Sequence, residues 1–158
     1  MSDVEVSVDE RSLAKGLIAG LIGGLAGTVA KTLAERVFPP RTHGEPDPPQ
    51  EAVESIAGHE LSPAAAAIVA EGIHWGFGAA VGAAYGALAE FYPAATAKEG
   101  ATFGMALEGL THEKALPVFG VSAEPADQTL RERISEVSSH VIYGVTTEFV
   151  RSFVRKLL

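Results

Sequence analysis

The sequence predicts an all-α fold, an integral membrane bundle of four helices, and three observations support this prediction. Two stretches, Gly16–Ala30 and 73–89, carry no Asp, Glu, Lys or Arg. The 158 residues include 17 glycines, many inside these apolar stretches. A glycine costs about 1 kcal/mol relative to alanine in a helix in water, whereas small residues let helices approach closely in lipid. Prolines separate the apolar segments from one another, as expected for helices joined by loops.

Proline or capping residues mark the boundaries of the expected helices. Pro39-Pro40 ends the first, and Pro93 and Pro117 close the second and third. Ser62-Pro63 is a suitable N-cap and first-turn pair for the second helix. The expected helices span about 12–38, 62–92, 98–115 and 128–156, in a membrane domain of residues 12–158 that follows a polar tail, 1–11.

The loop between the first two helices, PPRTHGEPDPPQ, is too rich in proline for regular structure. The following segment EAVESIAGHE can form a short interfacial helix. The N-terminus, MSDVEVSVDERS, is acidic, unlike the basic start of a signal peptide.

A membrane location is favoured by the first two helices. They approach the roughly 20 apolar residues that a bilayer requires, and they are apolar around nearly their whole circumference, without the polar stripe of a soluble surface helix. The third and fourth helices are shorter in apolar run, 100–107 and 137–147. Small residues form packing faces on the first and third helices: Gly20, Gly24, Gly27 and Thr28, then Gly100 and Gly104. A glycine-rich soluble bundle is the alternative.

The two halves of the chain resemble each other. His74-Trp-Gly-Phe-Gly in the second helix matches His140-Val-Ile-Tyr-Gly in the fourth, and the Gly20-x-x-x-Gly24 face matches Gly100-x-x-x-Gly104. The halves are either two repeated helical hairpins of one orientation, as in parallel-repeat membrane proteins, or a chance match of short motifs.

Composition excludes several classes of function. A formal charge of −8 argues against nucleic-acid binding, which needs clustered Lys and Arg. The absence of cysteine excludes disulfides and thiolate chemistry. The glycine-rich GLIGGLAG lacks the strand and the Gly-Lys-Ser/Thr of a nucleotide loop. We expect no enzyme.

Ionisable residues fall at helical spacings within the helices, where charges are costly and commonly functional. Lys31 and Glu35 are one turn apart, and three carboxylate–imidazole pairs follow: Glu71 and His74, Glu108 and His112, Glu136 and His140. Four hypotheses for the role of these residues stay open. They are a di-metal site built on Glu71-x-x-His74, a haem held by histidines, a proton or ion path, and mutual stabilisation at helix ends.

These residues resemble the pattern of the YagU-type family of bacterial inner-membrane proteins, a family of unknown function. The resemblance covers roughly 16–155 and implies a multi-pass protein of the bacterial inner membrane with four helices, but no reaction. The ionisable residues at matching positions are Lys31, Glu35, Arg41, His74, Glu90, His112, Glu136, His140, Glu148 and Arg151. Glu71 lies outside this pattern, which weakens the hypothesis of a di-metal site.

The leading functional expectation is a small membrane protein that conducts or senses a proton or small solute through a polar-cored bundle. It would contact the lipid bilayer and form a homo-oligomer or join a membrane complex. The alternatives are a non-transporting accessory subunit of a larger membrane complex, and a haem- or metal-binding protein that uses His74, His112 and His140. No cofactor is expected in the leading case. Since His74 and Glu90 lie about 24 Å apart along one helix, we expect two separate polar clusters.

Overall fold

The structure is a computed structural model that describes residues 11–41, 53, 62–111 and 129–158, and every regular element within these residues is helical. The prediction of an all-α fold is confirmed for this part of the chain. Its elements are the α-helices α1 (Leu13–Val37), α3 (Pro63–Phe91), α4 (Ala101–Leu110) and α6 (Leu130–Leu157), and one 3₁₀ segment, η2 (Pro93–Gly100).

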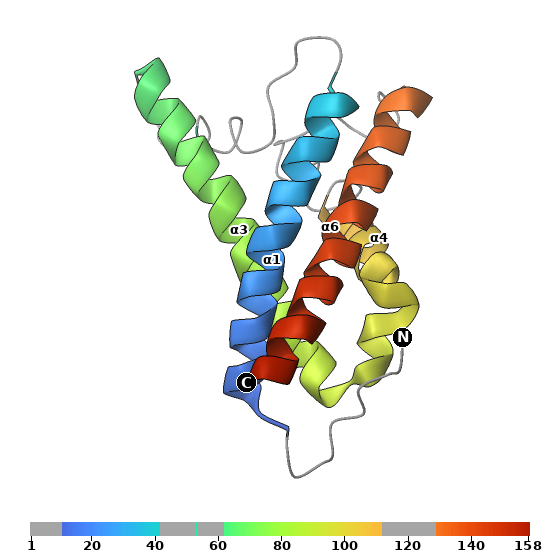
Figure 1. Cartoon of the computed structure of the whole chain (residues 1–158). Helices are drawn as coiled ribbons and strands as arrows, with labels where there is room; N and C mark the ends of the chain where they lie inside the picture. The colour runs from blue at the N-terminus through green and yellow to red at the C-terminus, as the bar shows by residue number, and fades with distance from the viewer. Residues whose placement is uncertain (1–10, 42–52, 54–61, 112–128) are drawn as a thin grey trace.

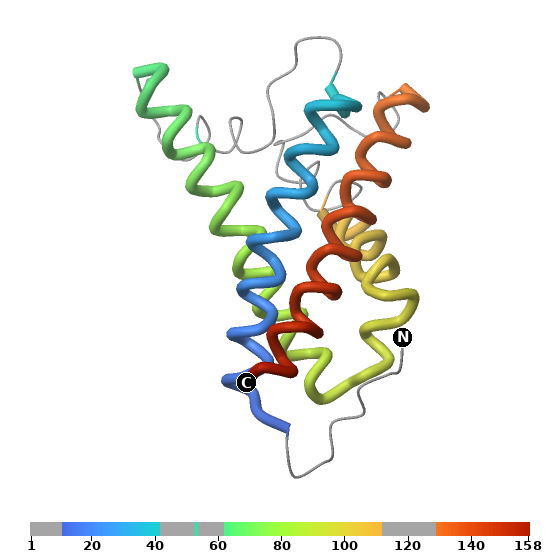
Figure 2. Tube along the Cα trace, viewed as in Figure 1, coloured from blue at the N-terminus to red at the C-terminus, as the bar shows by residue number. Residues whose placement is uncertain are grey.

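The helix α1 lies between α3 and α6, and α4 packs on α6 (Figure 1). We call the end of the bundle that holds Val37, Pro63 and Leu130 the upper end, and the opposite end the lower end. Figure 2 shows that α1 and α3 lie close together at the lower end and diverge towards the upper end. The pairs α1–α3 and α4–α6 are both antiparallel, with η2 joining them at the lower end.

Local sequence signals define the helix starts. Ser12 caps α1 by accepting a hydrogen bond from the Lys15 amide, and Ser62 caps α3 in the same way, followed by Pro63 as predicted. Thr129 and Glu132 form a capping box at the start of α6, in which each side chain bonds the backbone of the other. These bonds satisfy amide groups that have no partner inside the helix.

The third helix begins later than the sequence suggested. Lys98 and Glu99 have φ values of 52° and 56°, and Gly100 has φ of 85°, so the chain turns through left-handed conformations before α4 starts at Ala101. Glycine tolerates such a φ without strain from a Cβ atom. Residues 112–115 of the expected helix lie outside the described residues, as does the expected interfacial helix at 51–60 apart from Val53.

Glycines set the distance between helices. A Cβ atom added to Gly24 would lie 2.5 Å from the carbonyl oxygen of Gly78 and 2.8 Å from Cα of Gly82, so α1 and α3 meet backbone to backbone. Gly104 of α4 meets the backbone of α6 at His140 in the same manner. The helices therefore pack through the small residues that the sequence singled out.

The packing face predicted on α1 is in fact two faces. Gly20 and Gly24 contact α3, but a Cβ at Gly27 would lie 2.8 Å from the carbonyl oxygen of Tyr143 in α6. Gly23 also faces α6, at Thr147. Because α1 is packed between two neighbours, its glycines serve both sides.

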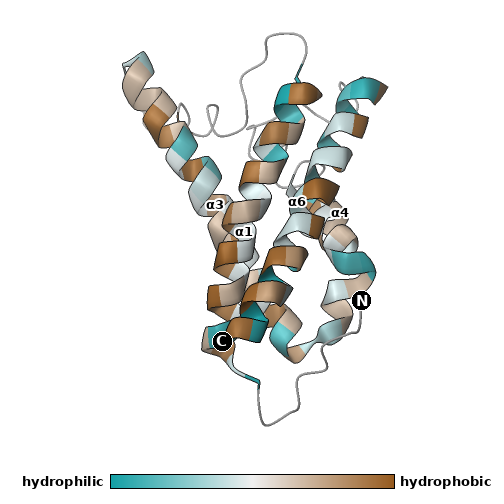
Figure 3. Cartoon of the chain, viewed as in Figure 1, coloured by the Kyte–Doolittle hydropathy of each residue, from teal (hydrophilic) through white to brown (hydrophobic). Residues whose placement is uncertain are grey.

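Two of the described helices, α1 and α3, are long and apolar enough to cross a membrane. Figure 3 shows hydrophobic residues along α1 and also along α6, where they alternate with hydrophilic ones. At 10 residues, α4 is about 15 Å long and is too short to span a bilayer alone.

Candidate functional site

Ionisable side chains between the helices, and the serines that hydrogen-bond to them, gather into two groups, one towards each end of the bundle. The lower cluster comprises Ser12, Tyr85, Glu90, Glu148, Arg151 and Arg155. The upper cluster comprises Lys31, Glu35, Arg41, Glu136, Ser139 and His140.

Glu90 ties three helices together in the lower cluster. Arg155 donates two hydrogen bonds to its carboxylate, at 2.8 Å from Nε and 2.7 Å from a terminal nitrogen. The backbone amide of Ser12, the N-cap of α1, donates a third bond at 2.7 Å. The end of α3 is thus fixed to the start of α1 and to the end of α6.

A second buried pair lies beside it. Arg151 donates to both oxygens of Glu148, each at 2.6 Å, and the Tyr85 hydroxyl donates to Glu148 at 2.7 Å. The ring of Tyr85 stacks on Phe103 of α4, with 4.0 Å between the ring centroids. This bidentate geometry is the strongest form of an arginine–carboxylate contact, and it joins α3, α4 and α6.

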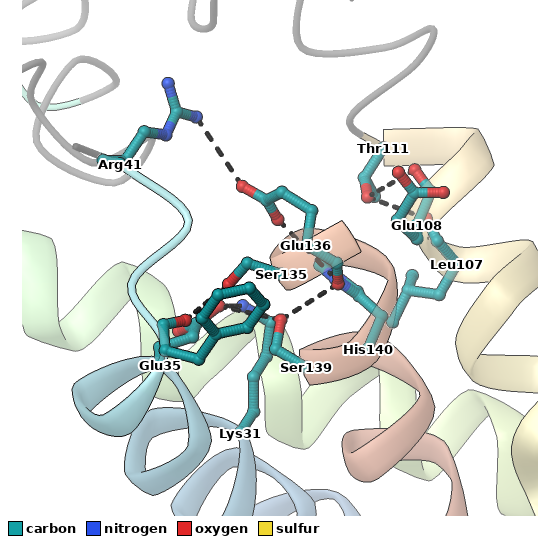
Figure 4. A network of polar contacts seen from close by, with 11 residues as sticks. Lys31, Glu35, Arg41, Leu107, Glu108, Thr111, Ser135, Glu136, Ser139 and His140 are labelled. Atoms are coloured by element: carbon teal, nitrogen blue, oxygen red, sulfur yellow. Dashed lines mark hydrogen bonds and ion pairs between the residues drawn. The ribbon is translucent and has the colours of Figure 1, made fainter. Parts of the chain in front are cut away.

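The upper cluster joins α1 to α6 and to the residues that follow α1 (Figure 4). Lys31 pairs with Glu35 one turn away, and Ser139 donates to the same Glu35 carboxylate at 3.0 Å. Arg41 lies 3.9 Å from the carboxylate of Glu136. Residues 104 positions apart in sequence, Glu35 and Ser139, therefore share a hydrogen bond.

Glu136 and His140 are the most enclosed titratable pair of the upper cluster, with relative exposures of 3% and 4%. Nδ1 of His140 lies 2.8 Å from the carbonyl oxygen of Glu136, which suits a ring protonated at Nδ1, and 3.8 Å from its carboxylate. Glu108 of α4 is drawn on the α4 side of this pair (Figure 4). The arrangement places a carboxylate and an imidazole together in a buried position.

The helix α3 contributes to both ends, since Glu90 belongs to the lower cluster and His74 lies in the upper half. Nε2 of His74 is 3.3 Å from the hydroxyl of Thr32 on α1. Thr32 directly follows Lys31 of the upper cluster.

Nine of the ten predicted site residues are described. Three belong to the lower cluster: Glu90, Glu148 and Arg151. Five belong to the upper cluster: Lys31, Glu35, Arg41, Glu136 and His140. His74 lies beside Thr32, and His112 lies outside the described residues.

The prediction omitted Arg155, Tyr85, Ser139 and Ser12. Arg155 was detectable, because it lies four residues after Arg151 and seven after Glu148, on the same face of a helix. Ser12 acts through a backbone amide and carries no signal in its residue type.

No group of three or more His, Asp or Glu side chains able to hold a metal ion occurs among residues 11–41, 62–111 and 129–158. Glu71, which the di-metal reading requires, accepts a hydrogen bond from Trp75 at 2.9 Å. In the described part of the chain, the carboxylates and imidazoles of the two clusters contact other side chains and backbone atoms.

Comparison with protein-family models gives a match over most of the chain. A family model described as a protein of unknown function (DUF1440) covers residues 25–149. The chain belongs to the DUF1440 family. Neither the search of curated proteins nor that of solved structures gave a match.

The DUF1440 match includes all six residues of the upper cluster, together with Tyr85, Glu90 and Glu148 of the lower cluster. Ser12, Arg151 and Arg155 fall outside it. A family of unknown function agrees with the kind of family that the sequence resembled, and it adds no activity.

Proposed function

We propose that this DUF1440 chain is an integral membrane protein that senses a proton or small ionic solute through the upper cluster. The single observation that carries the proposal is the reversed polarity of α6. Its inward face is polar and its outward face is apolar, the opposite of a helix on the surface of a soluble protein.

The inward face of α6 carries charged and hydroxyl-bearing residues. Glu136 and His140 are buried there, as are Glu148 and Arg151. Its outward face carries large apolar side chains with relative exposures of 36–74%: Leu130, Ile134, Ile142, Val145, Phe149, Phe153 and Leu157.

This reversal explains why α6 is not among the helices that are apolar enough on average to cross a membrane. Its 28 residues give a length of about 42 Å, which exceeds the roughly 30 Å of a bilayer core. With α1 and α3, it would form a membrane domain of three spanning helices, with α4 packed against one side. Ionisable residues inside such a domain normally face the bundle interior, as Glu136, His140, Glu148 and Arg151 do.

Sensing is favoured over conduction by the packing between the clusters. Tyr143 lies there on α6 and donates its hydroxyl to the Gly78 carbonyl at 2.7 Å. Gly20 and Gly24 of α1 meet the backbone of α3 at the same level of the bundle. A proton that enters the upper end reaches Glu136 and His140 before it meets these close backbone contacts.

Extraction of cell membranes with alkaline carbonate tests the membrane location. An integral protein stays in the pellet, whereas a soluble or peripheral one is released. Recovery of the chain in the soluble fraction would contradict the proposal.

The emission of Trp75, the only tryptophan of the chain, tests the sensing role in lipid nanodiscs. Trp75 follows His74, and the two rings lie edge to face at 6.4 Å. We expect a pH-dependent change of emission whose midpoint moves in Glu136→Gln. Since Trp75 donates to Glu71, Glu71→Gln is the matched control and should leave the midpoint in place. If only Glu71→Gln abolished the pH-dependent emission, the response would come from the bond between Trp75 and Glu71. This result would contradict sensing by the upper cluster.

Proteoliposome flux separates sensing from conduction. A proton flux above that of empty liposomes, abolished by Glu136→Gln, would assign conduction to the same cluster. Flux equal to that of empty liposomes agrees with sensing.

A second candidate, an accessory subunit of a larger membrane complex, is favoured by the upper half of α3. Ile68 and Val69 are 73% and 44% exposed, and a Cβ added at Gly72 or Gly76 would meet nothing within 4 Å. Co-purification of one membrane partner in stoichiometric amount would support this role over sensing.

A further inference from the structure

We propose that the groove between α1 and α6 at the upper end binds one anionic phospholipid. Its acyl chain would lie in the groove and its phosphate at Arg131. The inference rests on the membrane location proposed above, and adds to it a ligand of defined chemistry.

The groove has a volume of about 450 Å³, within the ~300–1,000 Å³ typical of small-molecule sites. Apolar side chains of α1 and of its C-cap form one wall, among them Leu33, Val37 and Phe38. The α6 wall includes Ser135, Ser138 and Ile142. Both walls of the groove are thus mainly hydrocarbon, with serine hydroxyls on the α6 side.

The residues on α6 follow the order of groups in a phospholipid. Arg131, Ser135, Ser138 and Ile142 share one stripe of the helix, because their spacings of three, four and seven residues return to the same face. Arg131 and Ser138 are separated by about 10 Å along the axis, and Ile142 lies about 6 Å further in. A cation, then the hydroxyl of Ser138, then an aliphatic side chain match a phosphate, an ester group and an acyl chain that enter from the membrane surface.

Arg131 is placed to hold a phosphate. Its guanidinium stacks over the Phe38 ring at 4.7 Å and donates from one terminal nitrogen to the Pro39 carbonyl at 3.0 Å. A guanidinium has five N–H donors, so several remain for a phosphate, which arginine binds in bidentate fashion. Arg131 is exposed, and so is Arg36 in the last turn of α1, which adds positive charge at this end.

The serines distinguish a lipid from a purely apolar partner. Ser135 donates to the Phe38 carbonyl, and Ser139 donates to Glu35. Ser138 is exposed in the groove and makes no side-chain hydrogen bond within the described residues. A free hydroxyl donor facing hydrocarbon is costly, and an ester carbonyl of a lipid would satisfy it.

Competition between two lipids tests the inference. Purified full-length protein in mild detergent is mixed with equal amounts of phosphatidylglycerol and phosphatidylcholine that carry identical acyl chains. Retained lipid is then counted by native mass spectrometry. We expect one bound phosphatidylglycerol per chain, at roughly fivefold preference, as expected for one arginine near a headgroup of net negative charge, because the choline cation neutralises the phosphate of phosphatidylcholine.

Two variants separate the headgroup from the acyl chain. Arg131→Gln should lower the preference towards unity, whereas Lys156→Gln, the same charge change on an exposed residue at the other end of α6, should leave it unchanged. Ile142→Trp fills the groove and should reduce retention of both lipids. Should Ile142→Trp fail to fold, Ser138→Ala replaces it as the test. This variant removes only the hydroxyl that would bond a lipid ester, and it should also reduce retention of both lipids.

Several results would overturn the inference. These are equal retention of both lipids by the wild type, equal effects of Arg131→Gln and Lys156→Gln, or a protein dimer in place of a lipid adduct. Competition by inorganic phosphate that displaces all retained lipid would assign the site to phosphate alone. If the chain resists carbonate extraction but shows no preference for phosphatidylglycerol, only the lipid site is overturned. If carbonate releases the chain, the membrane location is overturned as well.

Discussion

Glu90 and Arg155, 65 positions apart in the sequence, form a two-point ion pair with distances of 2.7 and 2.8 Å. The side chain of Glu90 is 1% exposed and that of Arg155 is 11% exposed, so the pair is enclosed. It joins the last turn of α3 to the last turns of α6, while the Ser12 amide adds α1 to the same carboxylate.

Loss of one partner of this pair should destabilise the bundle strongly. Glu90→Gln removes the carboxylate charge that faces the guanidinium of Arg155 in an enclosed site, and breaking a buried pair in this way costs about 3–5 kcal/mol. Thermal unfolding in detergent measures the effect. The double variant Glu90→Gln/Arg155→Gln should be less destabilised than the sum of the single variants, and additive effects would show that the two side chains do not interact.

Two tyrosine-to-phenylalanine variants should differ in cost. Tyr85 donates to the charged Glu148, a class of bond worth about 1.5–3 kcal/mol, and Tyr143 donates to a neutral carbonyl, worth about 0.5–1.5 kcal/mol. Tyr85→Phe should therefore lower the melting temperature more than Tyr143→Phe. Both variants keep the ring, so the stacking on Phe103 is retained in the first. The reverse order would contradict the charged contact.

Two glycines on α3 should respond oppositely to alanine. A Cβ at Gly82 would lie 2.6 Å from the Gly20 carbonyl oxygen and 2.8 Å from the Gly24 amide nitrogen, both backbone atoms. Gly82→Ala should thus cost about 1–3 kcal/mol through overpacking. Gly76→Ala is the matched control, since nothing lies within 4 Å of its Cβ, and it should be neutral or gain up to about 1 kcal/mol of helix propensity. A large loss in Gly76→Ala would instead indicate a partner on that face.

Single cysteines should distinguish lipid from water around α6, because the chain has no cysteine of its own. Phe149 is 61% exposed within α6, and Leu130 and Leu157 are 74% and 71% exposed at its two ends. In a membrane, Phe149→Cys should react with a charged maleimide far more slowly than Leu130→Cys and Leu157→Cys. Similar labelling of all three in intact membranes would show that α6 does not cross the bilayer.

Much of the fold could be predicted from local sequence. Ser62-Pro63 starts α3, and prolines follow the ends of α1 and α3, because capping and proline chemistry act over a few residues. The predicted start of the third helix was three residues too early, because the residue types of Lys98 and Glu99 do not signal the left-handed turn that they form. Glycine spacing indicated close helix packing, but not that Gly24 faces α3 while Gly27 faces α6.

The polar residues also include some contacts that the local sequence indicated and others that it did not. Spacing on one helix indicated the pairs Lys31–Glu35 and Glu136–His140, which lie a single turn apart. By itself the sequence determined the helices, their small-residue faces and the ionisable residues they carry, because these follow from local chemistry and helical periodicity. Only the tertiary structure decided which helices meet, and hence that Glu90 reaches Arg155, that Ser139 reaches Glu35, and that α6 turns its charges inward. Such contacts join segments distant in sequence, and helical periodicity does not specify the neighbour that a face packs against.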